Sequence, residues 1–540
     1  MSETAEHSAM PAYKWIEEPR KVQNIHGMEL WHFNGGIGFR VRNYGPSKSL
    51  VIRLSLYRED NTIEYYLMRA YFVEPWGQEH EKWQTHQLVL FPYESLHGAV
   101  NIVTFSYLLH KDGRAIPSEY EYKFARREDF FRAYVEQGDF HEEHFKRRSS
   151  YYVEDISSHA LQNALHSIRT ERQNVPMKPF FTRGDPGAPG HPAGEIHAML
   201  DRVLEAKHRD PHGRHYVHLA IFNFENEHIA NHLLHLHSQG VEVECLGGWE
   251  QVSSADWSWD VARLRRGGIP VYGVVRNTPY SPHEGIASMH TKIMLFDGQA
   301  VMSASYNLDF HRWGGNWENG IFYYSPPVSL LYEHVYQAVK GAVVKNLAIT
   351  LNDWYNLYYT LGVSHVHDGT LISPCDALAH EIYRAQTSIF IAMFDLGDFT
   401  LKGPHSRGVN LVEALTEAHR RGVYLVILLN GYRAEQELPL PEDGESVRPL
   451  KPVIQHLLEQ GIEVLLLYYQ DSPYSPLHHK FAVFDEETVI AESTNWYSAS
   501  LYSDEVFSVI RDGNLAREYI GELFLMLKKF RIRRGSEVWV

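Results

Sequence analysis

The segment at residues 289–297 reads MHTKIMLFD, and the segment at residues 478–485 reads HHKFAVFD. Each contains a histidine, a lysine two positions later and an aspartate five positions after the lysine. Downstream of each histidine, a serine follows at an offset of 15, an asparagine at 17 and a glutamate at 28 or 27. These residues are His290, Lys292, Asp297, Ser305, Asn307 and Glu318 in the first copy, and His478, Lys480, Asp485, Ser493, Asn495 and Glu505 in the second. Matching offsets over this many positions indicate a duplicated unit.

Each motif has the pattern of a buried strand. Polar and apolar residues alternate through the His-x-Lys portion, so the histidine and lysine side chains point to the same face. The residues that follow are apolar, as in a strand buried on both faces, and a turn begins at each aspartate. A second apolar strand follows in each copy, at residues 300–303 and 489–491, and leads into Ser-x-Asn. Each half therefore presents histidine, lysine, serine and asparagine as one polar cluster.

The side chains of this cluster suit phosphodiester cleavage. Lysine, asparagine and serine can hold the phosphate oxygens and compensate the negative charge that grows in the transition state. Histidine can serve as nucleophile or as acid for the leaving oxygen near neutral pH. Two histidines from two halves would supply both, with a covalent phosphohistidine between the steps. A carboxylate, Glu318 or Glu505, could bind one ring nitrogen and so present the other in the right tautomer.

With these residues the chain resembles the phospholipase D superfamily, whose signature is a duplicated HxKxxxxD motif with a downstream Ser-x-Asn and glutamate. The resemblance extends from about residue 190 to the C-terminus. It implies two α/β halves that face each other across a pseudo-twofold axis, with the active site in the groove between them and no metal or other cofactor in the chemistry. It also implies that one of His290 and His478 attacks phosphorus while the other protonates the leaving group. By the same resemblance, Asp297 and Asp485 of the motif are structural rather than chemical.

Two positions depart from the superfamily pattern. Glu492 stands where a glycine is common, and Ser503 replaces the asparagine that Asn316 provides before the first glutamate. The class of chemistry does not depend on these positions, but the substrate does not follow from the motif alone.

The two halves also differ around their histidines. His479 adds a bulky neighbour to His478, and two long loops of the second half, at residues 395–410 and 431–452, are expected to cover one side of the groove and seat the leaving group. We therefore predict His290 as the nucleophile and His478 as the general acid.

The composition is that of a globular protein with several domains. The chain has 540 residues, 44% of them hydrophobic, and no apolar run that approaches the ~18 residues of a membrane span. Its start lacks the apolar stretch of a signal peptide, and its two cysteines form no CxxC motif. We therefore expect a cytoplasmic protein whose only membrane contact is peripheral. The formal charge of −16 argues against tight non-specific nucleic-acid binding.

Composition and pattern divide the chain into five segments. They are an N-terminal arm (1–24), a β-sandwich-like domain (25–125), a connector (126–192) and two phospholipase D-like halves (193–350 and 351–540). Short β-rich runs between turn residues indicate the sandwich, and a charged stretch at 126–148 predicts a helix in the connector. In both halves strands alternate with helices, which predicts an α/β fold with mixed, mostly parallel sheets.

Three functions are compatible with these residues. The favoured one is a phospholipase D-type enzyme that hydrolyses or transfers phosphatidyl groups, because both motifs stand on one chain, a β domain could approach a membrane surface, and tryptophan and tyrosine suit an interface. The second is a nuclease of the same superfamily that cuts DNA or RNA through the same intermediate. The third is a catalytically silent binding module, against which the complete residue sets of both halves argue.

Overall fold

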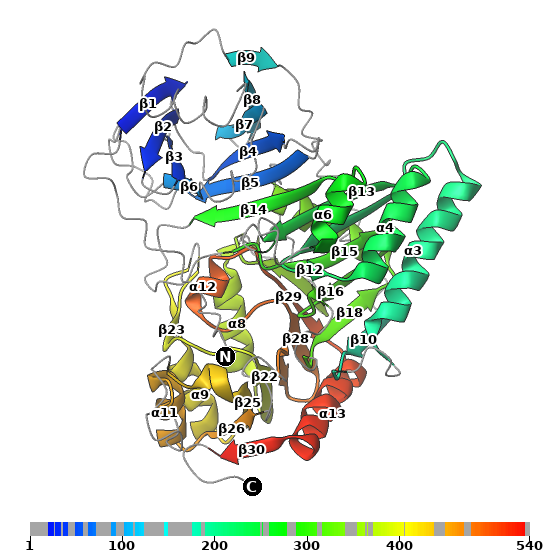
Figure 1. The fold of residues 1–540 in the computed structure, drawn as a ribbon. Helices are drawn as coiled ribbons and strands as arrows, with labels where there is room; N and C mark the ends of the chain where they lie inside the picture. Colours follow the sequence, from blue (N-terminus) through cyan, green and yellow to red (C-terminus); the bar gives the residue numbers. More distant parts are fainter. Residues whose placement is uncertain are drawn as a thin grey trace, which may run out of the picture. The chain divides into compact units, whose positions relative to one another are not determined.

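A computed structural model describes most of the two motif-bearing halves with their side chains (Figure 1). Between residues 20 and 148 it describes the backbone of nine strands. The other described residues are 175–184, 190–248, 251, 259–277, 288–309, 316–340, 354–361, 364–365, 371–403, 406–436, 449–468 and 477–534.

The chain forms two compact units. One comprises residues 1–153 with 272–280, and the other comprises residues 154–271 with 281–540. The sequence assigns residues 272–280 to the first phospholipase D-like half, whereas the contacts of this segment group it with the first unit. Strand β14 (Val271–Asn277) pairs in parallel with β5 (Ile63–Tyr71) of the first unit. Such a pairing joins distant segments, so the local sequence pattern cannot reveal it.

The described residues of the first unit form two β-sheets. One has the antiparallel order β1-β2-β3-β6, and in the other β14, β5, β4, β7, β8 and β9 follow one another. Their bounds are β1 (Arg20–Ile25), β2 (Met28–Phe33), β3 (Gly36–Val41), β4 (Ser49–Tyr57), β6 (Leu88–Pro92), β7 (Ile102–Lys111), β8 (Arg114–Lys123) and β9 (Phe145–Arg148). The described residues of this region are all in strands, as the sequence predicts. The helix predicted in the connector is wrong at Phe145–Arg148, because a short charged edge strand has no alternation that would reveal it.

Each half of the second unit has its own sheet. The strand order is β10-β18-β16-β15-β11-β13 in the first half and β19-β29-β28-β27-β22-β25-β26-β30 in the second. The first-half strands are β10 (Met177–Phe181), β11 (Tyr216–Ile221), β13 (Glu242–Gly248), β15 (Lys292–Phe296), β16 (Ala300–Ala304) and β18 (Asn319–Tyr323). The second-half strands are β19 (Tyr355–Tyr359), β22 (Ser388–Met393), β25 (Tyr424–Asn430), β26 (Glu463–Tyr468), β27 (Lys480–Phe484), β28 (Thr488–Glu492), β29 (Val506–Arg511) and β30 (Arg531–Arg534). The six strands of the first sheet thus recur in the same order in the second.

Both sheets are mixed, as predicted, but antiparallel pairs predominate. The pairs β11–β13, β22–β25 and β25–β26 are parallel, whereas those on the motif side of β11 and β22 are antiparallel. The prediction of mostly parallel sheets is therefore wrong. Each motif strand turns back directly into its hairpin partner, and a short turn permits only antiparallel pairing. Strand β10 lies inside the predicted connector yet pairs with β18, so the connector ends before residue 177.

The helices also repeat between the halves. They are α3 (Pro192–Arg209), α4 (Glu227–Ser238), α6 (Trp259–Arg266) and α7 (Pro326–Lys340) in the first half, and α8 (Pro374–Arg384), α9 (Leu411–Arg420), α10 (Gly431–Ala434), α11 (Pro452–Glu459), α12 (Ser498–Leu501) and α13 (Gly513–Lys529) in the second. Asn226 and Asn410 cap the N-termini of α4 and α9 through their side-chain oxygens. Gly240 and Gly422 follow the C-termini of the same helices with φ of 81° and 88°, a conformation that glycine adopts without strain.

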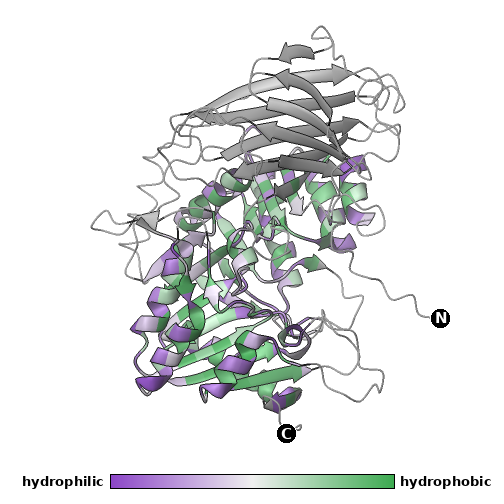
Figure 2. Ribbon diagram, turned by 90° about the vertical axis from the view of Figure 1, so that its left-hand side faces the viewer, coloured by the Kyte–Doolittle hydropathy of each residue, from purple (hydrophilic) through white to green (hydrophobic). Residues whose placement is uncertain are grey.

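Each half has its own hydrophobic core between its sheet and its helices. In Figure 2 the strands are largely hydrophobic, and the helices that flank them carry both hydrophobic and hydrophilic residues. The motif strands β15, β16, β27 and β28 are buried at every position. Within the described residues, none of the helices combines the length and hydropathy that crossing a bilayer requires.

The motif aspartates directly follow the buried motif strands, at the end of each strand that is far from the histidine. Asp297 and Asp485 have φ of 52° and 53° and begin the turns to β16 and β28. The Asp485 carboxylate accepts backbone N–H groups from residues 386–388, at 2.7–3.1 Å, where β22 begins. Asp297 accepts the N–H of Tyr216, at the start of β11. Each aspartate thus fixes the neighbouring strand to the motif hairpin.

Replacing Asp485 with alanine should lower the free energy of unfolding by about 2–4 kcal/mol, because it removes charge-assisted hydrogen bonds and leaves alanine in the left-handed region. Asparagine tolerates this backbone and keeps one acceptor oxygen, so Asp485→Asn should lose less. Urea unfolding of both variants measures the difference. An alanine variant as stable as the parent protein would contradict the structural role.

Candidate active site

The motif histidines lie where the two halves meet. Each stands two residues before its strand, β15 or β27. The N–H of His290 donates to the carbonyl of Asp504, and the N–H of His478 donates to the carbonyl of Trp317, both at 3.0 Å. Each of these carbonyls belongs to the residue before a motif glutamate. The motif of one half is therefore bonded to the glutamate segment of the other.

The histidines and glutamates pair crosswise between the halves. Nδ1 of His290 lies 2.8 Å from Oε1 of Glu505, and Nδ1 of His478 lies 2.7 Å from both carboxylate oxygens of Glu318. The side chains of both glutamates are 1% exposed, whereas those of His290 and His478 are 16% and 11% exposed. With Nδ1 occupied, Nε2 is the nitrogen that each histidine can present to a substrate.

Serine hydroxyls hold the glutamates in place. Ser305 donates to Oε2 of Glu318 at 2.7 Å, and Ser500 of α12 donates to Oε1 of Glu505. Ser493 binds both backbone groups of Val506, at 3.0 and 3.1 Å, and so fixes the residue after Glu505. The motif spacing identified Ser305 and Ser493. It did not include Ser500, because the first half has no counterpart at that spacing.

Two threonines outside the motif fix the same glutamates through their backbone. Oγ1 of Thr182 accepts the N–H of Glu318, and Oγ1 of Thr360 accepts the N–H of Glu505, both at 3.0 Å. Each threonine directly follows an edge strand, β10 or β19. An aromatic pair precedes both threonines and could have revealed them. Their separation from the glutamate differs between the halves, so an alignment on the histidines misses them.

An aromatic ring packs on each histidine. The ring centre of Phe222 lies 5.0 Å from that of His290, and the ring centre of Phe394 lies 4.5 Å from that of His478, both edge to face. The ammonium groups of the two motif lysines lie 5.4 and 5.2 Å from the same phenylalanine rings. Both phenylalanines are the first residue after a strand, β11 or β22, so a comparison of the two halves could have found them.

The motif asparagines have amide oxygens without a hydrogen-bond partner among the described residues. Asn307 and Asn495 are both buried, and Oδ1 of each is unpaired. The two ends of an amide can exchange by rotation, so either an oxygen or an NH2 group can face a ligand. Both side chains can therefore donate to a phosphate oxygen.

A family model described as "Cardiolipin synthase, PLD-like domain" matches residues 211–339 and 378–525, just over half of the chain. Both copies of the motif, with their serines, asparagines and glutamates, fall within the matched segments. The chain belongs to the phospholipase D superfamily.

Several solved structures are similar to the chain at low identity. A polyphosphate kinase from Porphyromonas gingivalis is 14% identical, with a TM-score of 0.43 over 92% of this chain and 74% of that one. A phosphatidylserine synthase from Haemophilus influenzae is 11% identical, with a TM-score of 0.44 over 69% and 91%. Nuc, a phospholipase D family member from Salmonella typhimurium, is 20% identical, with a TM-score of 0.23 over 33% and 97%. None of the curated proteins matches the chain.

Burial governs the protonation of the phospholipase D motif. Burial and the two motif ammonium groups hold the pKa of His290 and of His478 well below the ordinary histidine value. Burial raises the pKa of Glu318 and of Glu505 to about 7. Burial also lowers the pKa of Lys480 to about 8, although the two glutamates oppose this shift. Near neutral pH the histidine rings are therefore uncharged. Nε2 of each is the nitrogen open to a substrate, and Nζ of Lys480 lies 3.3 Å from Nε2 of His478.

The two loops that the sequence predicts over the groove, at residues 395–410 and 431–452, are joined by ion pairs. Asp395 of the first loop accepts hydrogen bonds from Arg433 and Lys451 of the second, at 2.9 and 2.8 Å. Asp395 directly follows the phenylalanine that packs on His478, so this junction lies beside the second motif. Residues 437–448 of the second loop lie outside the described residues.

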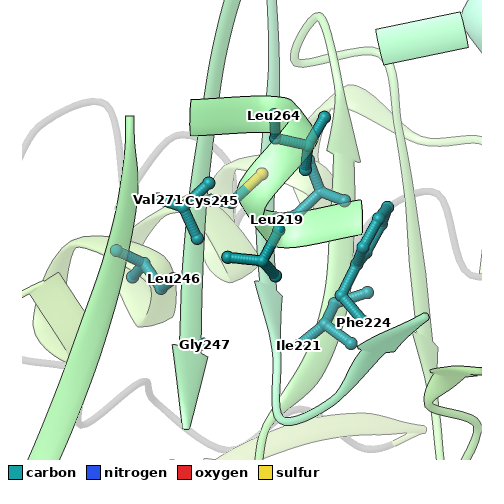
Figure 3. Close-up of a pocket in the computed structure, with 9 residues that line it drawn as sticks. Leu219, Ile221, Phe224, Cys245, Leu246, Gly247, Leu264 and Val271 are labelled. Atoms are coloured by element: carbon teal, nitrogen blue, oxygen red, sulfur yellow. The ribbon is translucent and has the colours of Figure 1, made fainter. Parts of the chain in front are cut away.

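An apolar pocket in the first half is not part of this site. Its lining includes Leu219, Cys245 and Leu264 (Figure 3), and none of its lining residues belongs to either motif. Burial raises the pKa of the Cys245 thiol far above its usual range, so the thiol stays protonated and unreactive. The pocket is a packing gap in the core of the first half.

The pH dependence of kcat/KM should be bell-shaped. As the pH falls through about 7, the His290–Glu505 pair takes up a proton and its carboxylate no longer accepts the Nδ1 hydrogen of His290. As the pH rises through about 8, Lys480 loses the charge that would bind phosphate. Rates measured from pH 5 to 10 on a soluble phosphodiester test both limbs. A flat profile across pH 6–9 would contradict this electrostatic account.

Proposed function

We propose that the protein is a phospholipase D-type phosphodiesterase that acts through a phosphohistidine and uses phosphatidyl groups as substrate. The observation that carries the proposal is the pair of crossed histidine–glutamate hydrogen bonds. They leave two uncharged imidazoles, one from each half, each with an available Nε2 beside a lysine. One such histidine could attack phosphorus but could not also protonate the leaving oxygen, so two are needed.

In the first step, Nε2 of His290 attacks phosphorus and the bond from phosphorus to the leaving oxygen breaks. The proton that the leaving oxygen requires comes from Nε2 of His478, which carries it while Glu318 is protonated and donates its carboxyl hydrogen to Nδ1. As Nε2 gives up its proton, the hydrogen of Glu318 passes to Nδ1, so the ring stays uncharged and Glu318 becomes a carboxylate. The Nδ1 hydrogen of His290 stays on Glu505, which stabilises the positive charge that the attacking ring acquires. The lysine ammonium groups and the asparagine amides bind the phosphate oxygens as negative charge accumulates.

In the second step, His478 takes a proton from water or from an alcohol, and the resulting nucleophile attacks phosphorus. The bond between phosphorus and His290 breaks, and its electron pair returns to Nε2. Both histidines are then restored to their starting protonation states. Water as acceptor gives hydrolysis, and an alcohol as acceptor gives transfer of the phosphatidyl group.

The choice of phospholipid as substrate rests on three supports. The matched family model is described by a lipid-synthesising enzyme, cardiolipin synthase. The formal charge of −16 disfavours binding of a polyanion such as DNA or RNA. The first unit, which is rich in β-strands, offers a separate surface for peripheral membrane contact. A nuclease of the same superfamily is the alternative and would use the same two steps.

A substrate panel tests this proposal. We expect purified protein to release headgroup from phosphatidylglycerol or phosphatidylcholine vesicles, and to leave single- and double-stranded DNA and RNA intact. Activity should persist in excess EDTA, because the lysines and asparagines can compensate phosphate charge without a cation. Cleavage of nucleic acid alone would establish the nuclease alternative. Loss of activity in EDTA that a single divalent ion restores would contradict the metal-free mechanism.

His290→Ala and His478→Ala should each lower kcat on the natural substrate by about 10³-fold or more, because each removes a group that makes or breaks a bond. With bis(4-nitrophenyl) phosphate, whose leaving group needs no acid, His478→Ala should recover part of the lost rate and His290→Ala almost none. Burst kinetics and 4-nitrophenolate release provide the measurement. Unchanged urea midpoints serve as the folding control, and the opposite pattern of rescue would reverse the two roles.

A further inference from the structure

Glu492 is a buried carboxylate that the mechanism does not use. It is the last residue of β28, and its side chain is fully buried. Its φ is 115°, whereas the other described non-glycine residues with positive φ lie between 46° and 55°. A residue with a Cβ is strained in this region, and such strain persists only where surrounding contacts enforce it. Most of those contacts come from the opposite half.

The carboxylate of Glu492 accepts hydrogen bonds from four hydroxyl groups. Ser303 of β16 donates to Oε2 at 2.6 Å, and Tyr323 of β18 donates to Oε1 at 3.0 Å. Tyr332 of α7 and Ser508 of β29 also donate to Oε1, the latter at 2.8 Å. Three of the four donors belong to the first half, while Glu492 belongs to the second. Three donors bind Oε1 and one binds Oε2, so both oxygens of the buried carboxylate have hydrogen-bond partners.

Among the described residues, the other titratable groups around Glu492 are neutral. The titratable groups that face it are tyrosines, from β18, α7, β19 and α13, and burial raises the pKa of each. Burial also raises the pKa of Glu492, while the hydroxyl groups oppose that rise. Tyr323 and Tyr332 therefore act as neutral donors to Glu492.

Glu492 connects the two segments that hold Glu318 and Glu505. It directly precedes Ser493, which fixes the backbone beside Glu505, the partner of His290. Its bond to Ser303 anchors the strand that continues to Ser305, whose hydroxyl binds Glu318, the partner of the other histidine. The carboxylate of Glu492 thus fixes the distance between the segment that contains Ser493 and the segment that contains Ser305.

The first half has no equivalent of this carboxylate. Ala304 stands directly before Ser305, where Glu492 stands before Ser493. Burying a carboxylate has a larger desolvation penalty than burying an apolar side chain of similar size. We therefore attribute to Glu492 the alignment of the two halves rather than a gain in packing. Hydroxyl-to-carboxylate bonds fix direction and distance, which apolar contacts do not.

We propose that Glu492 is a positioning residue that aligns the two halves so that both crossed histidine–glutamate pairs form, and this role rests on the proposed phosphodiesterase function. Loss of the carboxylate displaces the glutamates from their histidines by a fraction of an ångström to an ångström. A displacement of that size affects the chemical step more than the binding of substrate.

Three substitutions and one matched control test this role with bis(4-nitrophenyl) phosphate. Glu492→Gly relieves the strained φ and removes the carboxylate, Glu492→Gln keeps the shape, and Ser303→Ala removes one bond between the halves. The control is Glu381→Gln, because Glu381 is buried and binds Arg511 at 2.7 Å within the second half alone. Kinetic constants are measured over pH 5–10 and stability by urea unfolding.

The Glu492 variants should lose about 10- to 100-fold in kcat with KM changed less than about twofold, and Ser303→Ala should lose less. The limbs of their kcat/KM profile should move by about half a pH unit or more, since the histidine–glutamate pairs are altered. Glu381→Gln should be less stable, with the parent kcat and pH profile. A Glu492→Gly variant with the parent kcat and pH profile would overturn the proposal. If that variant does not fold, parent values for Ser303→Ala would overturn it equally.

The proposed function and this role can fail separately. A parent protein without activity on any phosphodiester refutes the proposed function. In that case the crystal structure of Glu492→Gly decides the positioning role. At least one histidine–glutamate pair should open beyond hydrogen-bonding distance, and two pairs at their present separations would overturn it.

Discussion

The structure depends on the hydrogen bond that each motif histidine makes to the glutamate of the opposite half. A buried glutamate is costly unless its partners are in place, and here the partners come from a segment more than 150 residues away. Neither half can therefore form a histidine–glutamate pair by itself. The backbone N–H groups of His290 and His478 also donate to the opposite half, each to the carbonyl of the residue before a motif glutamate. The interface between the halves and the candidate active site are consequently one structure.

The duplicated sheets hold the histidines and glutamates at fixed distances from each other. Each histidine stands at the end of a strand that is buried at every position, so its backbone has little freedom to shift. The motif aspartates secure the far ends of the same strands, and the threonines after β10 and β19 secure the glutamates. Residues remote from phosphorus thus preorganise the groups that would contact it.

The duplication is nevertheless not exact in its details. Ser500 supports only one of the two glutamates, and Glu492 has Ala304 as its counterpart. The second half also carries the junction of Asp395 with Arg433 and Lys451 beside its histidine. Two histidines with the same scaffold but different neighbours can have different roles, as a reaction with one nucleophile and one acid requires. The asymmetry is confined to hydrogen-bonding side chains, while the strand order is shared.

The sequence by itself determined the family, the motif strands, most helices and the residues gathered at the interface, because motif spacing and hydrophobic period are properties of neighbouring residues. It could not determine which glutamate serves which histidine, since either pairing satisfies the same spacing. It also missed Thr182, Thr360, the pairing of β14 and the preference for antiparallel strands. Only the tertiary structure decided these, because each depends on contacts between segments far apart in the chain, 136 positions for Thr182 and 215 for His290. Glu492 shows the division best: the sequence marked it as a departure, and its four hydroxyl partners exist only once both halves have folded against each other.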